Sequence, residues 1–221
     1  MEGVEDIPGT ALHEGISWEW ETFPEYLHAI DKRRYAVDIA AYVPHGAVRG
    51  YVMGERGARN EDATAEDLAE MARIVREARE AGAVGFSTSR TMGHKAKDGQ
   101  PVPGTFASAE ELNALADALV AGGGGIFEIA PEVLPDGGDQ PTMGMTEELQ
   151  WMGDLALRTD LKVTFLLLQY MTMPDAWKQA LDHSSKILEQ GGYLRPQIAA
   201  RPFGMMVGWA GYHPFSKRPT Y

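Results

Sequence analysis

The chain alternates short apolar runs with longer stretches in which apolar residues recur every three or four positions. Apolar runs of fewer than about eight residues are typical of buried strands, and the longer periodic stretches are typical of amphipathic helices. Five strands are predicted on this basis, over residues 37–43, 83–87, 125–130, 162–168 and 194–200. A polar loop and a helical stretch separate each strand from the next, so the pattern predicts repeated β-loop-α units.

Residues that favour helix N-termini mark the starts of the predicted helices. A short helix is expected after Thr22, and long helices are expected to begin near Thr64, Ser108, Thr146 and Pro174. Glu111 follows Ser108 by three residues, which is the spacing of a capping box. The first strand is expected to lead instead into a polar, glycine-bearing loop that begins at His45.

Alternating strands and helices occur both in doubly wound sheets and in (β/α) barrels. The absence of a G-x-G-x-x-G loop after the first strand favours the barrel. The predicted strands begin 46, 42, 37 and 32 residues apart, and eight such units need roughly 310 residues. We therefore predict an α/β fold that is a partial TIM-like barrel of about five units. Residues 1–34 are interpreted as a lead-in, and residues 35–221 as one incomplete barrel domain truncated at both ends.

The amino-acid composition limits the molecules that this chain is expected to bind and the compartment in which it is expected to occur. A net charge of -12 without a basic cluster argues against nucleic acid. The chain has no cysteine, which excludes disulfides and thiolate metal ligands, and its first residues lack the pattern of a signal peptide, so a cytoplasmic location is expected. The most apolar window, residues 163–168, is much shorter than the roughly 20 residues that a membrane span needs.

Active sites of (β/α) barrels lie at the carboxyl ends of the strands, which selects one set of polar residues. The set contains His45, Ser87, Thr88, Ser89, Arg90, Glu128, Gln169 and Arg201. Together these side chains suit an anionic substrate or a water-activating ion, although any single one could equally just cap its loop. His45 is either a ligand or base, or a hydrogen-bonding partner of the loop backbone. Glu128 lies in an apolar run, where a carboxylate needs a partner or a metal.

Four stretches carry a resemblance to a known family. They read VPHGAVRGYVMGERGA at 43–58, TAEDLAEMARIVREAREAGAVGFSTSRT at 64–91, DGQPVPGTFAS at 98–108 and HPFSKRPTY at 213–221. With the lead-in at 1–27, they resemble the amidohydrolase superfamily, and within it the N-acyl-D-amino-acid deacylase (D-aminoacylase) group. The resemblance implies a metal-dependent hydrolase barrel that cleaves a non-peptide carbon–nitrogen bond. In this family a zinc-type ion activates water and polarises the acyl carbonyl.

The same resemblance implies where metal ligands should lie. The family's H-x-H pair and cysteine ligand are expected on strands before Met1, and its catalytic aspartate on a strand after Tyr221. Two further family histidines are expected on the strands that here read GIFEIAPE and KVTFLLLQ, which contain none. In the first strand Glu128 is the residue that could offer a metal an oxygen, and in the second Gln169 stands where the family often has a substrate-binding lysine.

Two functions are therefore compared. The first is an amidohydrolase acting on an N-acylated amino acid or related amide, with His45, Ser87, Arg90, Gln169 and Arg201 facing the substrate. The second is a non-catalytic barrel that binds a small molecule and has lost its metal. This chain alone is expected to lack both a tight zinc site and hydrolytic activity, and its oligomeric state is left open.

Overall fold

The computed structural model describes residues 4, 7–132, 144–170, 173–200 and 220. The strands are β1 (Tyr42–Pro44), β2 (Gly85–Ser89), β3 (Ile126–Ala130), β4 (Lys162–Leu166) and β5 (Leu194–Gln197). The helices are α1 (Gly9–Gly15), α2 (Phe23–Asp31), α3 (His45–Met53), α4 (Glu55–Ala58), α5 (Ala65–Glu80), α6 (Ala109–Ala121), α7 (Met145–Arg158) and α8 (Ala176–Glu189). No helix within these described ranges is long and apolar enough to cross a membrane.

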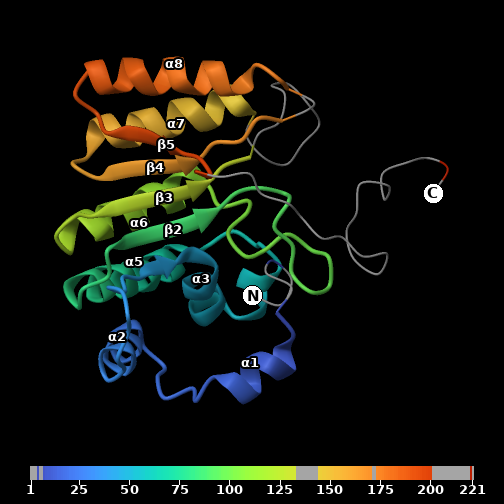
Figure 1. Ribbon diagram of the computed structural model, residues 1–221, viewed down its shortest axis with the longest axis vertical. Helices are drawn as coiled ribbons and strands as arrows, with labels where there is room; N and C mark the ends of the chain where they lie inside the picture. Colours follow the sequence, from blue (N-terminus) through green and yellow to red (C-terminus); the bar gives the residue numbers. More distant parts are fainter. Residues whose placement is uncertain (1–3, 5–6, 133–143, 171–172, 201–219, 221) are drawn as a thin grey trace.

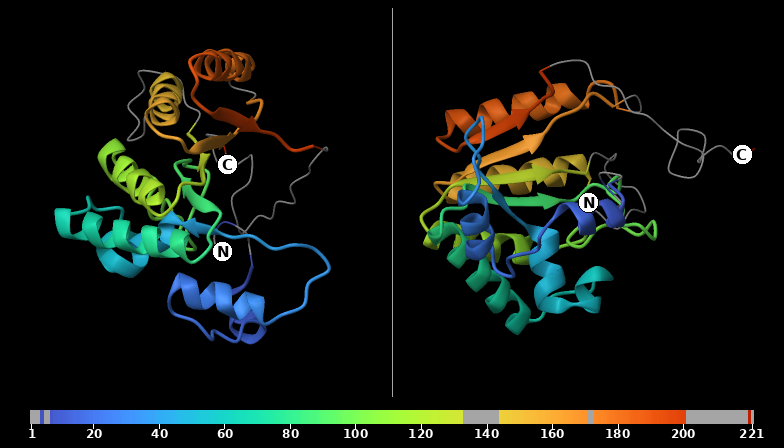
Figure 2. Two further views of the ribbon diagram at one scale, coloured as in Figure 1. Left: turned by 90° about the vertical axis from the view of Figure 1, so that its left-hand side faces the viewer. Right: turned by 60° about the horizontal axis from the view of Figure 1, so that its bottom comes forward.

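The five strands form one parallel sheet in the order in which they occur along the chain (Figure 1). Figure 2 shows α5, α6, α7 and α8 side by side along one face of the curved sheet. A doubly wound sheet reverses its strand order and carries helices on both faces, whereas consecutive strands with helices outside are the arrangement of a barrel. The structure therefore confirms the predicted partial (β/α) barrel of five parallel strands.

The hydrophobic core lies between the sheet and this helix layer. Alternate strand residues such as Phe86, Phe127, Val163 and Phe165 are at most 1% exposed. They pack with buried apolar residues of the helices, among them Met71, Leu115 and Met152. Because successive strand residues point to opposite faces, the residues between them lie on the face away from these helices, which we call the inner face.

The first strand is shorter than predicted. Residues 37–41 do not form a strand, and Val37 and Ile39 are 71% and 48% exposed. Only Tyr42–Pro44 runs in register with β2, starting opposite Gly85. The apolar run from residue 37 therefore does not mark a buried strand, because the neighbouring strand has no residues with which it could pair.

Two helical segments were missed by the sequence pattern. His45 does not begin a loop but is the first residue of α3, which follows β1 directly and continues into α4. Pro44 occupies the N-cap position of α3 with an extended backbone. Proline is tolerated there because the N–H group that it lacks would have no hydrogen-bond partner within the helix. The other missed helix is α1, which lies in the lead-in.

Helix starts were predicted with mixed accuracy. Thr22 and Thr64 form complete capping boxes with Glu25 and Asp67, as expected for α2 and α5. Thr146 does not cap α7, which begins one residue earlier with Gly144 at its N-cap. The fourth long helix begins after Asp175 instead of at Pro174.

Candidate functional site

Four polar side chains occupy one row across the inner face of the sheet. Ser87 of β2 is the register partner of Glu128 of β3, Glu128 is that of Thr164 of β4, and Thr164 is that of Arg195 of β5. We call these four residues the polar row. In a complete barrel the inner face is the barrel interior, and its carboxyl end is where substrates bind.

Glu128 is a partly buried carboxylate without a hydrogen-bond or ion-pair partner in the described part of the chain. Burial raises the pKa of Glu128 above its usual value, because removal from water disfavours the charged form. Tyr42 of β1 lies within electrostatic range. Burial, and after it the charge of Glu128, raises the pKa of the Tyr42 hydroxyl. Perturbed, unpaired groups of this kind are typical of functional sites.

Thr164 presents a second unsatisfied group beside Glu128. Its side chain is 8% exposed, and its Oγ1 atom is buried without a hydrogen-bond partner among the described residues. Buried hydroxyls are nearly always hydrogen-bonded, since an unpaired one loses its contacts with water and gains nothing in return. The middle of the polar row therefore has hydrogen-bonding capacity that the described protein groups do not use.

His45 lies behind the sheet, in a cluster with Arg49, Thr88 and Glu111 that we call the His45 cluster. The His45 ring is 1% exposed, with Nδ1 2.8 Å from Thr88 Oγ1 and Nε2 2.7 Å from Glu111 Oε1. Arg49 Nε lies 2.9 Å from the same Glu111 oxygen. Because the Glu111 carboxylate accepts hydrogen bonds, Nε2 carries the proton, and Nδ1 then accepts from the Thr88 hydroxyl.

The charges of this cluster follow from its burial. Burial lowers the pKa of His45, and the hydrogen bond to Glu111 only partly opposes this. Burial acts to raise the pKa of Glu111, but the hydrogen bond and charge of His45, with Arg49, outweigh it and lower the pKa. A neutral imidazole beside an ionised carboxylate and the Arg49 guanidinium satisfies both shifts.

Arg90 forms an ion pair with a carboxylate on the helix side of the sheet. It is 2% exposed, with Nε 2.5 Å from Glu148 Oε1 on α7, and its Nη1 donates to the Ala107 carbonyl at 2.7 Å. Burial raises the pKa of Glu148, although the charge of Arg90 acts in the opposite direction. The pair ties the end of β2 to α7.

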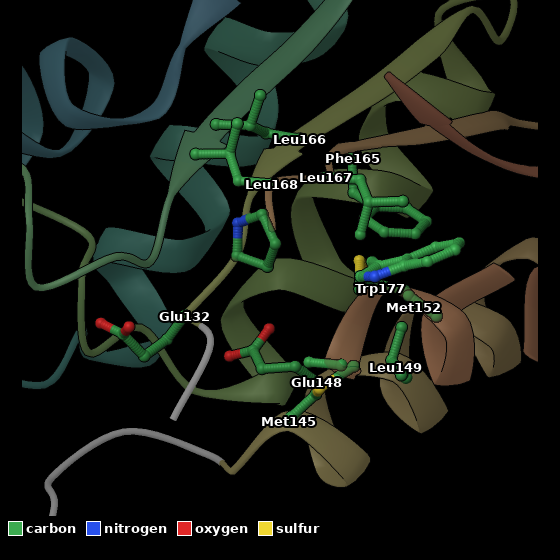
Figure 3. Close-up of a pocket in the computed structure, with 13 residues that line it drawn as sticks. Glu132, Met145, Glu148, Leu149, Met152, Phe165, Leu166, Leu167, Leu168 and Trp177 are labelled. Carbon is green, nitrogen blue, oxygen red and sulfur yellow. The ribbon is translucent and has the colours of Figure 1, made fainter. Parts of the chain in front are cut away.

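Glu148 also lines a cavity of about 20 Å³ between β4, α7 and α8. Figure 3 shows the carboxylates of Glu132 and Glu148 toward one side of this cavity and the rings of Phe165 and Trp177 toward the other. The volume is close to that of one water molecule. Glu148 Oε2 is buried without a hydrogen-bond partner among the described residues, so a single ordered water is the occupant that this cavity suits.

The candidate residues selected from the sequence divide into separate locations. Ser87 and Glu128 lie together on the inner face. On the helix side, His45 is buried in a hydrogen bond to Glu111 and Arg90 in an ion pair with Glu148. Gln169 is exposed after β4, where its Nε2 lies 3.5 Å from the Pro174 carbonyl.

Arg201 lies outside the described residues. Thr88 belongs to the His45 cluster, and Ser89 Oγ lies 2.7 Å from Nδ1 of His94. Of the strand-end residues selected from the sequence, Ser87 and Glu128 are therefore neighbours on the inner face, while His45 and Arg90 lie on the helix side of the sheet.

The sequence analysis missed the two carboxylates that bind His45 and Arg90, those of Glu111 and Glu148. Glu111 was interpreted as half of a capping box with Ser108. Ser108 does accept from the Glu111 backbone, but the Glu111 side chain turns to His45 and Arg49 instead. Glu148 gave no signal beyond its place in an amphipathic helix. A glutamate on the apolar face of a helix is the feature that indicates such a buried pair.

The polar row does not match the donor set of a zinc site. Zinc sites use histidine nitrogen, cysteine sulfur and carboxylate oxygen, in sets of three or four protein ligands. The row offers one carboxylate and two hydroxyls. Within the described ranges no group of three or more His, Cys, Asp or Glu side chains could hold a metal ion. The described residues therefore do not form the metal centre that the resemblance implies, and we derive no step through a metal.

Comparisons with known sequences and structures find two D-aminoacylases and an N-acyl-D-glutamate deacylase. D-aminoacylase from Alcaligenes xylosoxydans xylosoxydans is 32% identical over 117 residues, which cover 53% of this chain and 22% of that protein. A D-aminoacylase mutant in complex with 100 mM CuCl2 has a TM-score of 0.62 at 21% identity, covering 80% of this chain and 33% of that chain. N-acyl-D-glutamate deacylase from Bordetella bronchiseptica, complexed with zinc and a phosphonate inhibitor, has a TM-score of 0.63 at 23% identity. The match covers 82% of this chain and 34% of that chain.

The two structures share the fold of this chain, and the chain spans only about a third of their length. It spans less than a quarter of the curated relative. The sequence model of the amidohydrolase family matches residues 1–210, which is nearly all of this sequence. This match extends from the lead-in through all five strands. The chain belongs to the amidohydrolase family.

Proposed function

We propose that this chain is the central part of an amidohydrolase barrel that hydrolyses the amide bond of an N-acyl D-amino acid. The observation that carries the proposal is the family match across residues 1–210. The five strands supply one wall of a barrel whose polar inner face is the surface that a substrate would contact. The named relatives are D-amino-acid deacylases, which supports the N-acyl D-amino acid as the substrate class.

The chemistry requires groups beyond those described here. In this family a metal activates the attacking water and polarises the acyl carbonyl, and the described residues include no group able to hold it. We therefore propose that the 221-residue chain alone is inactive and that a full-length protein containing it supplies the metal ligands. The absence of cysteine is in keeping with a cytoplasmic protein.

Substrate contacts are proposed for Ser87, Gln169 and Arg201, as expected from the sequence. For His45 and Arg90 the geometry supports a positioning role, since their buried contacts with Glu111 and Glu148 fix the ends of β1 and β2 relative to α6 and α7. Substrate contact by His45 or Arg90 would require these contacts to open.

The test is release of free amino acid by the full-length protein, measured with N-acetyl-D-amino acids and their L-enantiomers, with and without added zinc. Metal-dependent turnover of the D-series supports the proposal. Turnover of neither series in the presence of zinc contradicts it.

A second function is a barrel that binds the same ligands without hydrolysing them. The specific observation in its favour is that the inner faces of β3 and β4 carry Glu128 and Thr164 and no histidine. Saturable binding of N-acetyl-D-amino acids by the full-length protein, without turnover at any zinc concentration, would support this second function.

A further inference from the structure

The inner face of the sheet has an acidic side and a basic side. Glu128 lies on β3, while Arg195 on β5 and Lys162 on β4 supply positive charge. Thr164 separates Glu128 from Arg195 within the polar row. No ion pair joins these charges to one another within the described ranges. Since neighbouring strands are roughly 4.8 Å apart, the backbones at Glu128 and Arg195 are about 10 Å apart.

Two charged groups of the row have no ion-pair partner among the described residues. Glu128 has no hydrogen-bond partner there either. The Arg195 guanidinium lies over the Tyr193 ring, 5.2 Å from its centroid, without a carboxylate partner in the described structure. An acceptor and a bidentate cation on strands two apart are complementary to a ligand that carries an N–H at one end and a carboxylate at the other.

We propose that the polar row binds the amino-acid part of an N-acyl amino acid in one orientation, with its carboxylate toward Arg195 and its amide N–H toward Glu128. The inference rests on the proposed function and adds the direction in which the substrate lies across the strands. Arginine is suited to the carboxylate, because its planar guanidinium makes two parallel hydrogen bonds to it.

The spacing of the row fits such a ligand. In an amino acid the nitrogen and the carboxyl carbon are two bonds apart, roughly 2.5 Å. With hydrogen bonds of about 2.9 Å at each end, the contacts span about 8 Å, which the Glu128 and Arg195 side chains can reach from backbones about 10 Å apart. The acyl group then extends beyond Glu128 toward Ser87 and β1.

Isothermal titration calorimetry on the full-length protein without added zinc tests the orientation with three ligands. They are N-acetyl-D-leucine, its carboxamide, which lacks the carboxylate, and its N-methyl derivative, which lacks the amide hydrogen. We expect N-acetyl-D-leucine to bind at least about tenfold more tightly than either analogue, since each analogue loses one hydrogen bond to a charged group.

Two variants connect each preference to its residue. Arg195→Gln should abolish the preference for the acid over the carboxamide and keep the preference for N–H over N-methyl. Glu128→Met, which removes the acceptor oxygens that a glutamine would partly keep, should do the reverse. Arg158→Gln and Glu147→Gln change the same charges on α7, in the helix layer outside the sheet, and should leave both preferences unchanged.

Three results would overturn the inference: equal binding of all three ligands, no binding of any, or loss of a preference in the α7 variants. The proposed function fails differently. If the full-length protein hydrolyses N-acetyl-D-leucine but neither row variant alters ligand preference, the function stands and the orientation is wrong. If the preferences follow the variants but no turnover occurs, the orientation stands and the catalytic function is wrong.

Discussion

Glu111 Oε1 lies 2.7 Å from His45 Nε2, although the two residues are 66 positions apart in the chain. Both side chains are nearly inaccessible, at 3% and 1% exposure. The contact joins the first turn of α3 to the first turn of α6 across the edge of the sheet, and Arg49 approaches the same carboxylate. One buried carboxylate thus holds the helix after β1 against the helix after β2.

Removing this carboxylate should be costly. We expect Glu111→Gln to destabilise the fold by about 3–5 kcal/mol, because it leaves Arg49 as a buried charge without its partner. Urea unfolding of the two proteins measures the difference. Glu110→Gln, at the neighbouring exposed position of α6, should change stability by less than about 0.5 kcal/mol. Equal stability of wild type and Glu111→Gln would show that the pair is not formed.

The lowered pKa of His45 predicts how stability depends on pH. The unfolded chain binds a proton at His45 below about pH 6.5, while the folded protein resists protonation there because the ring is buried. The free energy of unfolding should therefore have its full value above about pH 6.5. It should fall as the pH decreases toward the pKa of His45 in the folded protein. Unfolding free energies between pH 7.5 and 5.5 measure this slope.

A His45→Asn variant provides the comparison for that slope. Whatever its absolute stability, it should show a smaller slope between about pH 6.5 and 5.5, since asparagine does not titrate. An unchanged slope would assign the pH dependence to other groups.

The partial barrel was predictable from the sequence because periodicity and caps report local structure. Thr22 and Thr64 cap helices as expected, and the runs around Phe127 and Phe165 are the strands β3 and β4. The exposed run at Val37 and Ile39 misled the same reasoning, because pairing with β2 decides where β1 begins.

The candidate site was less predictable, since the face on which a side chain lies depends on register. Ser87 and Thr88 are adjacent in sequence, yet Ser87 joins Glu128 on the inner face and Thr88 joins His45 behind the sheet. No pattern of residue types separates the two. The capping-box spacing of Glu111 even indicated a local partner, whereas its side chain binds residues more than 60 positions away.

The Arg90–Glu148 pair should behave as a unit. Glu148→Leu alone leaves the Arg90 guanidinium buried without its carboxylate and should cost about 3–5 kcal/mol. The double variant Arg90→Met with Glu148→Leu should recover much of this loss, because two apolar side chains replace two buried charges. Chemical denaturation of the wild type, both single variants and the double variant measures the coupling. Additive losses would show that the two side chains do not interact.

Gly85 allows β2 and β3 to approach. A Cβ atom at this position would lie 1.9 Å from the Ile126 carbonyl oxygen, which is backbone and cannot rotate away. We expect Gly85→Ala to destabilise the fold by about 1–3 kcal/mol or more through displacement of the strands. Gly50→Ala is the matched control, since a Cβ at that helical position meets no atom within 4 Å. Thermal unfolding compares the two variants, and a neutral Gly85→Ala would contradict the strand register.

The most direct measurement of the central claim is the rate at which zinc-loaded full-length protein releases D-leucine from N-acetyl-D-leucine, with the 221-residue chain assayed beside it. Membership of the amidohydrolase family, with one wall of the barrel in this chain, predicts turnover by the full-length protein and none by the chain alone. Turnover by the isolated chain, or none by the zinc-loaded full-length protein, would contradict the account.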